Sequence, residues 1–160
     1  MYEAVIAVGG LFLGYLIARM TKEELAAGEK WLRLICNAIL GVFVLWILIN
    51  AFDFKLGIGI VIGLILGFFI FNPYLYLGLL GVMTYYGLNR ELFAILVMLF
   101  GLSYMGLYYK QAGWKFFVFY ICLFLLPYAL VYFENNYNWL WYGIAIGGMF
   151  HVVRENYKRD

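Results

Sequence analysis

Charged residues divide this chain into long uncharged runs, which are too apolar and too numerous for a soluble core of its size. The runs are Ala4–Ala18, Leu34–Phe52, Leu56–Leu88, Leu92–Tyr109, Phe116–Phe133 and Trp139–Val153. Of the 160 residues, 67% are hydrophobic and 12% are charged, whereas soluble domains average about 45–50% and about 25%. A domain this small could not bury the excess away from water. The sequence therefore predicts an all-α integral membrane protein, with the lipid bilayer as its surroundings.

The third run, Leu56–Leu88, is too long for one transmembrane helix, which needs about 20 residues. Asn72-Pro73 lies at its middle, and proline cannot continue a helix before it without loss of a hydrogen bond. At the first position of a new helix, the missing N–H of Pro73 costs little. We therefore expect two antiparallel helices here. A single kinked helix or a re-entrant pair is the alternative.

This turn gives about seven short crossings, which we expect to form one compact bundle in a single transmembrane domain over residues 1–160. The expected helices cover about 2–20, 32–52, 56–71, 73–88, 91–109, 115–133 and 138–153. Tyrosine, tryptophan and terminal basic side chains can extend the shorter helices into the membrane interface. The connections are short, so consecutive helices are expected to lie side by side and antiparallel.

Lysine and arginine test this topology, because they concentrate in cytoplasmic loops. Seven crossings place nine basic residues on one side: Arg19, Lys22, Lys30, Arg33, Lys110, Lys115, Arg154, Lys158 and Arg159. Only Lys55 and Arg90 fall on the other side. This bias predicts an N-terminus outside and a C-terminus inside. A single crossing over Leu56–Leu88 would split the basic residues about evenly instead.

The longest connection, Thr21–Leu32, has the signals of a short interfacial helix at about 22–28. Thr21 with Glu24 fits a capping box, in which a hydroxyl and a carboxylate satisfy free backbone N–H groups. Gly28 is a suitable helix end. A solvated connector without a helix is the alternative.

Glycine recurs every four residues on three of the expected helices. The glycines are Gly10 and Gly14, then Gly59, Gly63 and Gly67, and finally Gly143 and Gly147. Four residues is nearly one helical turn, so each set shares a face on which another backbone can approach closely. We expect these positions to pack helices together. The lining of a narrow pathway is the alternative.

Polar residues gather in the inner half of the expected bundle. If they converge, they would line a vestibule that is open to the cytoplasm. Scattered hydrogen bonds between helices are the alternative, each contributing about 0.6 kcal/mol. The candidate vestibule residues are Asn37, Asn72, Ser103, Tyr104 and His151.

The sequence predicts no catalytic residue, no metal site and no cofactor. One histidine cannot build a metal site, and no carboxylate lies at mid-membrane depth to couple transport to a cation. The two cysteines, Cys36 and Cys122, lie in apolar runs, and we expect both to be buried packing residues. A net charge of +2 without a basic stripe argues against nucleic-acid binding.

Transport is the leading functional hypothesis: a small channel or carrier for a small solute or ion, multi-pass in the cell membrane. In topology alone, seven helices with the N-terminus outside resemble sugar facilitators of the three-plus-one-plus-three type and trimeric cation channels. The Pro-Gln signature of the first group and a convincing three-helix repeat are not found. One short echo, between Ile6–Phe12 and Ile144–Phe150, does not indicate a duplication.

Two other classes of function stay open. The first is a non-catalytic subunit or scaffold of a larger membrane complex, whose partner would be another copy of the chain or another membrane protein. The second is an intramembrane enzyme that acts on lipid or peptide. Such an enzyme would need a nucleophile, paired acids or a metal site at membrane depth.

Overall fold

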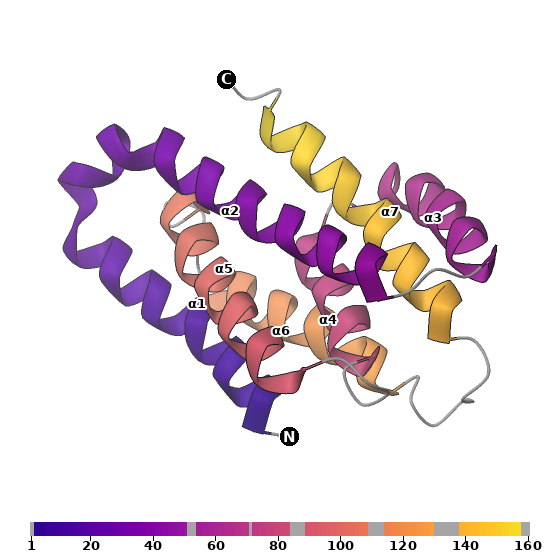
Figure 1. The fold of residues 1–160 in the computed structure, drawn as a ribbon. Helices are drawn as coiled ribbons and strands as arrows, with labels where there is room; N and C mark the ends of the chain where they lie inside the picture. The colour runs from indigo at the N-terminus through magenta and orange to yellow at the C-terminus, as the bar shows by residue number, and fades with distance from the viewer. Residues whose placement is uncertain are drawn as a thin grey trace. The chain divides into compact units, whose positions relative to one another are not determined.

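The computed structural model describes residues 2–50, 54–70, 72–83, 89–108, 114–129 and 138–157. Within these ranges the chain is helical and contains no strand, which confirms the all-α class. Figure 1 shows the helices in chain order. They are α1 (Tyr2–Met20), α2 (Lys22–Asn50), α3 (Phe54–Gly67), α4 (Pro73–Met83), α5 (Arg90–Tyr108), α6 (Trp114–Ala129) and α7 (Asn138–Tyr157).

The helices belong to two compact units. The first comprises Met1–Ile39 and Asn89–Phe119, and the second comprises Leu40–Leu88 and Tyr120–Asp160. In the first unit α1 packs along α5, and in the second α7 packs along α3 and against α4 (Figure 1). The helices α2 and α6 each contribute residues to both units.

The chain breaks between α3 and α4, at the place that Asn72-Pro73 predicts. Asn72 caps α4, because its side-chain oxygen accepts a hydrogen bond of 2.9 Å from the Tyr74 N–H. Pro73 is the first residue of α4, where it needs no N–H partner. α3 ends at Gly67 rather than at the expected residue 71, because the N–H groups of Phe68 and Phe69 form short-range turn bonds. Residues 84–88 of the expected helix lie outside the described part of the chain.

The interfacial helix expected at 22–28 is wrong as a separate element, because α2 continues through Gly28 to Asn50. The Thr21 hydroxyl donates to the Ile17 carbonyl, and the Glu24 N–H donates to the Thr21 carbonyl, so the expected capping box does not form. A helical glycine costs only about 1 kcal/mol. An ion pair from Arg33 to Glu29, four residues apart, supports the helix across the expected gap.

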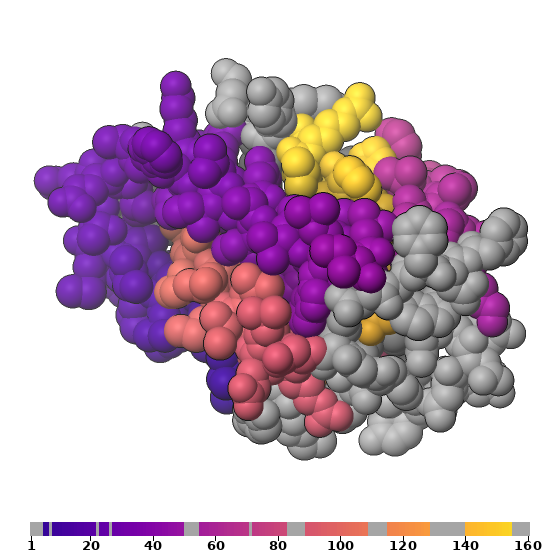
Figure 2. Space-filling view, viewed as in Figure 1, coloured from indigo at the N-terminus to yellow at the C-terminus, as the bar shows by residue number. Residues whose placement is uncertain are grey.

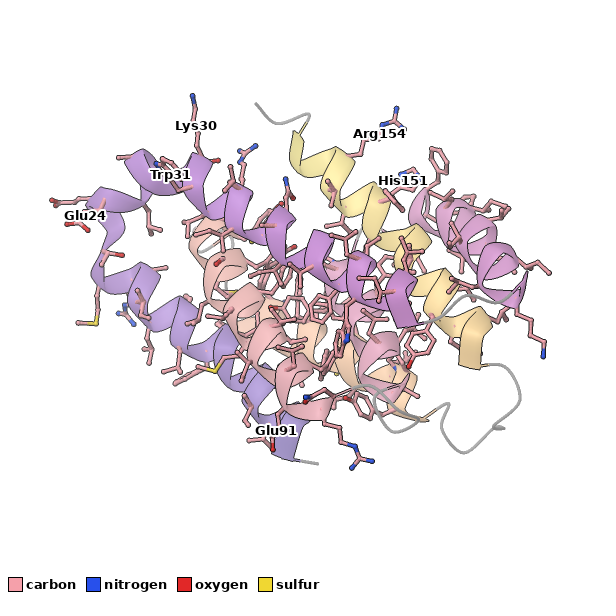
Figure 3. All side chains as sticks on the ribbon, viewed as in Figure 1. Glu24, Lys30, Trp31, Glu91, His151 and Arg154 are labelled. Atoms are coloured by element: carbon pink, nitrogen blue, oxygen red, sulfur yellow. The ribbon has the colours of Figure 1, made fainter. Side chains whose placement is uncertain are left out.

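α2 carries its charged residues at one end and large apolar residues along the rest. Figure 3 shows Glu24 and Lys30 projecting away from its first turns. Beyond them Leu34, Leu45 and Ile49 are exposed, and Figure 2 shows α2 side chains on the surface along the helix. This is an apolar exposed face on a long helix, with its polar part confined to the start.

Two segments of the described chain are long and apolar enough to cross a membrane, namely Ala27–Ile49 and Arg90–Tyr108. Apolar helical segments of 10–17 residues occur at Val8–Met20, Lys55–Gly67, Pro73–Val82 and Lys115–Tyr128. α7 runs to Tyr157, four residues past its expected end. The multi-pass topology and the single transmembrane domain stay predictions.

Candidate functional site

A glycine face brings α3 and α7 into close backbone contact in the second unit. A Cβ added at Gly59 would lie less than 3.0 Å from the backbone of Leu140 and Gly143. A Cβ added at Gly63 would meet the backbone of Ile144 equally closely. Only glycine fits at these positions, because any side chain would push the two backbones apart.

Glycines of α7 also lie against the backbone of α3. A Cβ added at Gly143 would lie within 3.0 Å of the Leu56 carbonyl, and one at Gly147 would lie as close to the Ile60 carbonyl. Glycine Cα–H groups thus face carbonyl oxygens in both directions, an arrangement in which weak Cα–H···O contacts add to dispersion. Each helix supplies glycines to the other, so the interface is reciprocal.

A second glycine contact joins α1 to α5 in the first unit. A Cβ added at Gly10 would overlap the Met98 backbone, and one added at Gly14 would lie 2.8 Å from the Leu102 Cα. The seven glycines with four-residue spacing therefore all lie at helix contacts, with Gly67 against the ring of His151.

Both glycine-packed pairs are parallel. Along α1, residues 10 and 14 meet residues 98 and 102 of α5, so the two chain directions agree. Along α3, residues 59, 63 and 67 meet residues 140, 144 and 151 of α7 in the same order. Three of the described helices separate the members of each pair in the sequence. In a membrane, two such helices are parallel only if an odd number of crossings lies between them.

His151 lies at the last glycine of the α3–α7 contact. A Cβ added at Gly67 would lie 2.6 Å from the His151 Cδ2 atom. The imidazole centre is 4.2 Å from the ring centre of Phe68, and the residue is 6% exposed. Figure 3 shows His151 beside α3, one turn before Arg154, which points away from α7. The imidazole thus occupies the space that Gly67 leaves at this end of the pair.

Tyr76 fixes α4 against α7 and closes the turn after α3. A Cβ added at Gly148 would overlap the Tyr76 ring, so the ring lies directly on the glycine. The Tyr76 hydroxyl donates a 2.9 Å hydrogen bond to the Ile70 carbonyl, beyond the end of α3. This residue was not among the candidates from the sequence. The glycine pair Gly147-Gly148 is the only sequence signal for it, since the second glycine points to a second neighbour of α7.

The candidate vestibule residues have different surroundings. Asn72 caps α4 and is 7% exposed, so its side-chain oxygen has a structural role. Ser103 and Tyr104 are buried on α5, where the Tyr104 ring lies 5.4 Å from Phe100 and 4.6 Å from Tyr108. Asn37 is half-buried on α2.

The two units divide the candidate residues between them. Asn37, Ser103 and Tyr104 belong to the first unit, and Asn72 and His151 to the second. Their convergence into one vestibule stays a prediction.

Reactive side chains do not gather among the described residues. No group of three or more histidine, cysteine, aspartate or glutamate side chains comes together there. Cys36 is buried as expected, but Cys122 is exposed, and both are free thiols. The expectation for Cys122 was wrong because a residue in an apolar helical run need not face the protein interior.

The chemistry of the two helix pairs is therefore that of close backbone packing, with the buried side chain of His151 at one end of the α3–α7 pair. Ser103 is also buried, but it lies on a different face of α5 from Met98 and Leu102, which meet α1. Comparison of the chain with family models, with curated proteins and with solved structures finds no match.

Proposed function

We propose that the chain is a multi-pass integral membrane protein of the cell membrane, with seven crossings, the N-terminus outside and the C-terminus inside. The exposure of α3 supports membrane insertion. α3 buries a glycine stripe and Leu56, while Ile58, Val61 and Ile65 are each more than 40% exposed. A helix that is apolar all round and not enclosed by protein is stable in lipid.

The parallel helix pairs support the count of crossings. α2, α3 and α4 lie between α1 and α5, and α4, α5 and α6 lie between α3 and α7. Three crossings between the partners make each pair parallel, as the glycine contacts require. If α3 and α4 formed one crossing together, the number would be two, and α1 would oppose α5. The parallel pairs therefore argue against a single crossing over Leu56–Leu88 and support a break at Asn72.

Within this topology, we propose that the protein is a small channel or carrier for a small solute or ion. The observation that carries the proposal is that one helix of each glycine-packed pair holds a buried polar residue, Ser103 on α5 and His151 on α7. Polar side chains at membrane depth are expensive to bury and mark solute pathways. Both lie toward the inner ends of their helices in the proposed topology. A pathway that begins at the cytoplasm would meet them first.

A scaffold subunit of a larger membrane complex is the second candidate. The observation that favours it is the structural use of Asn72 as a helix cap, which takes one polar group away from a vestibule. Its partner would be a second copy of the chain or another membrane protein. A scaffold needs no solute pathway and would pack through exposed apolar faces such as that of α2.

Solute flux separates the two candidates. The full chain is reconstituted in liposomes, and the flux of small ions and neutral solutes is compared with empty liposomes. For transport, we expect flux above the background, and a drop of about tenfold in His151→Leu, equivalent to about 1.4 kcal/mol. The control is Phe150→Leu, because Phe150 is the neighbouring residue and is 51% exposed.

The flux measurement distinguishes transport from the scaffold role, and it tests the role of the His151 imidazole. Background flux from well-folded protein would reject transport and favour the scaffold, especially if a membrane partner co-purifies in fixed ratio. Equal losses in His151→Leu and Phe150→Leu would reject a specific role for the imidazole.

A further inference from the structure

The two glycine-packed pairs join helices that hold the same place in two halves of the chain. α1 and α5 each begin a series of three helices, and α3 and α7 each end one. α4 stands between the two series. The pairing therefore matches first helix with first helix and third with third.

The third helices share a sequence. Leu56–Gly63 reads Leu-Gly-Ile-Gly-Ile-Val-Ile-Gly, and Leu140–Gly147 reads Leu-Trp-Tyr-Gly-Ile-Ala-Ile-Gly. Five of the eight positions are identical, at a constant separation of 84 residues. The identical positions include both glycines that each helix places in the α3–α7 contact.

The first and second helices show the same correspondence at slightly larger separations. The sequence Ala-Gly-x-Lys occurs at Ala27–Lys30, within α2, and again 85 residues later at Ala112–Lys115, of which Lys115 lies in the first turn of α6. Ile-Cys occurs at Cys36 and at Cys122, and these are the only two cysteines of the chain. In the first helices, a glutamate and a Leu-Phe pair recur 88 residues apart. They are Glu3 with Leu11-Phe12, and Glu91 with Leu99-Phe100.

The residues that meet in the glycine contacts are separated by the same numbers of positions as the matching sequences. In the first unit, residues 10 and 14 meet residues 98 and 102, each of which is 88 positions further on. In the second unit, Gly59 meets Leu140 and Gly143 meets Leu56, so exchange of the two helices by 84 positions reproduces the contact. Gly63 with Ile144 and Gly147 with Ile60 form another exchanged pair. Such reciprocity is what a local two-fold axis between equivalent helices produces.

We propose that the chain is a tandem duplication, in which α1–α3 and α5–α7 are two copies of one three-helix unit in the same membrane orientation, joined by α4. Three crossings leave the chain on the opposite side of the membrane from its start. A second copy inserted directly would be inverted. The added crossing α4 returns the chain to the first side, so that both copies carry glutamate at the outer end and Ala-Gly-x-Lys at the inner end.

The duplication also predicts the position of a solute site. Carriers built from parallel repeats place their site where the repeats meet. Here the copies meet at α1–α5 and α3–α7. In the α3–α7 contact, Gly67 of the first copy faces its equivalent in the second copy, which is the polar residue His151. This step rests on the proposed transport function, whereas the duplication itself does not.

Labelling of equivalent positions tests the shared orientation. On a Cys36→Ala/Cys122→Ala background, single cysteines replace Glu3, Glu91, Lys30 and Lys115, and whole cells are treated with a membrane-impermeant maleimide. We expect the two glutamate positions to react in intact cells and the two lysine positions to react only in inverted vesicles. Members of a pair that react from opposite sides would overturn a duplication in one orientation, whatever the liposomes show.

Paired glycine substitutions test the reciprocal contact. Gly59→Ala and Gly143→Ala should lower the apparent Tm in detergent by equal amounts within error, and so should Gly63→Ala and Gly147→Ala. Gly57→Ala is the control, since a Cβ there meets nothing within 4 Å. A loss in only one member of each pair would overturn the equivalence of α3 and α7. The duplication and the transport function can fail separately. If equivalent cysteines react from the same side and the paired glycine variants lose equal Tm, but the liposomes show no flux, the duplication is supported and transport is rejected.

Discussion

Replacement of Gly63 by leucine is expected to separate α3 from α7 and to destabilise the folded chain severely. The added Cβ alone would overlap the Ile144 backbone, which cannot rotate away as a side chain can. Overpacking a tight contact costs about 1–3 kcal/mol or more, and we expect the upper end because backbone lies on the facing side. The measurement is the apparent Tm in detergent together with the fraction of monodisperse protein.

Gly57→Leu is the matched control for this substitution. Gly57 lies on the same helix, is exposed, and has open space where its Cβ would be. We expect its Tm to stay within error of the parent chain. If Gly63→Leu proved as stable as Gly57→Leu, the α3–α7 contact would not be as close as the glycine spacing and the structure indicate.

Loss of the Tyr76 side chain is the second large effect that we expect. Tyr76 is 1% exposed, its ring lies on Gly148, and its hydroxyl binds the Ile70 carbonyl. Tyr76→Ala should therefore lower the free energy of unfolding by about 3–5 kcal/mol, as for other large aromatic residues cut to alanine in a core. Both the α4–α7 packing and the turn after α3 lose their common support.

Tyr76→Phe separates the two roles of this residue. It keeps the ring on Gly148 and removes only the hydrogen bond, so we expect a loss of about 1 kcal/mol. Unfolding by denaturant in mild detergent measures both variants. Equal losses in Tyr76→Phe and Tyr76→Ala would show that ring packing on Gly148 contributes nothing.

Much of the fold follows from local sequence signals. Arg19, Lys55 and Arg90 mark helix ends to within a few positions. The Asn72-Pro73 turn forms because its two residues suit a cap and a first helical position. The glycines at four-residue spacing indicate contact faces, but they do not name the partner helix. Spacing along one helix describes a face, whereas the partner depends on how distant parts of the chain pack.

Other features could not be read from local signals. Gly28 resembles a helix end, yet helix propensity on both sides and the Glu29–Arg33 pair carry α2 through it. The correspondence between the two halves is also hidden, because its separation changes from 88 to 84 residues along the chain. An ungapped comparison instead favours the echo between Ile6–Phe12 and Ile144–Phe150, which joins helices that occupy different places in the two series.

The candidate site was only partly predictable for the same reason. His151 stands out as the only histidine, but its position against Gly67 depends on the parallel register of α3 and α7. Asn72 was grouped with the vestibule because its amide is polar and near the inner side. In the structure that amide binds the Tyr74 N–H, a local bond that suits asparagine before a helix.

The central claim is that the break after Gly67 separates two crossings. The parallel pairs and the charge bias support this claim, and the proposed duplication depends on it. Single cysteines at Phe69 and Arg90, on the background without native cysteines, test it most directly. Both positions are exposed, with Phe69 at 79%. We expect an impermeant maleimide to label Arg90→Cys in intact cells and Phe69→Cys only in inverted vesicles. Labelling of both positions from the same side would contradict the claim.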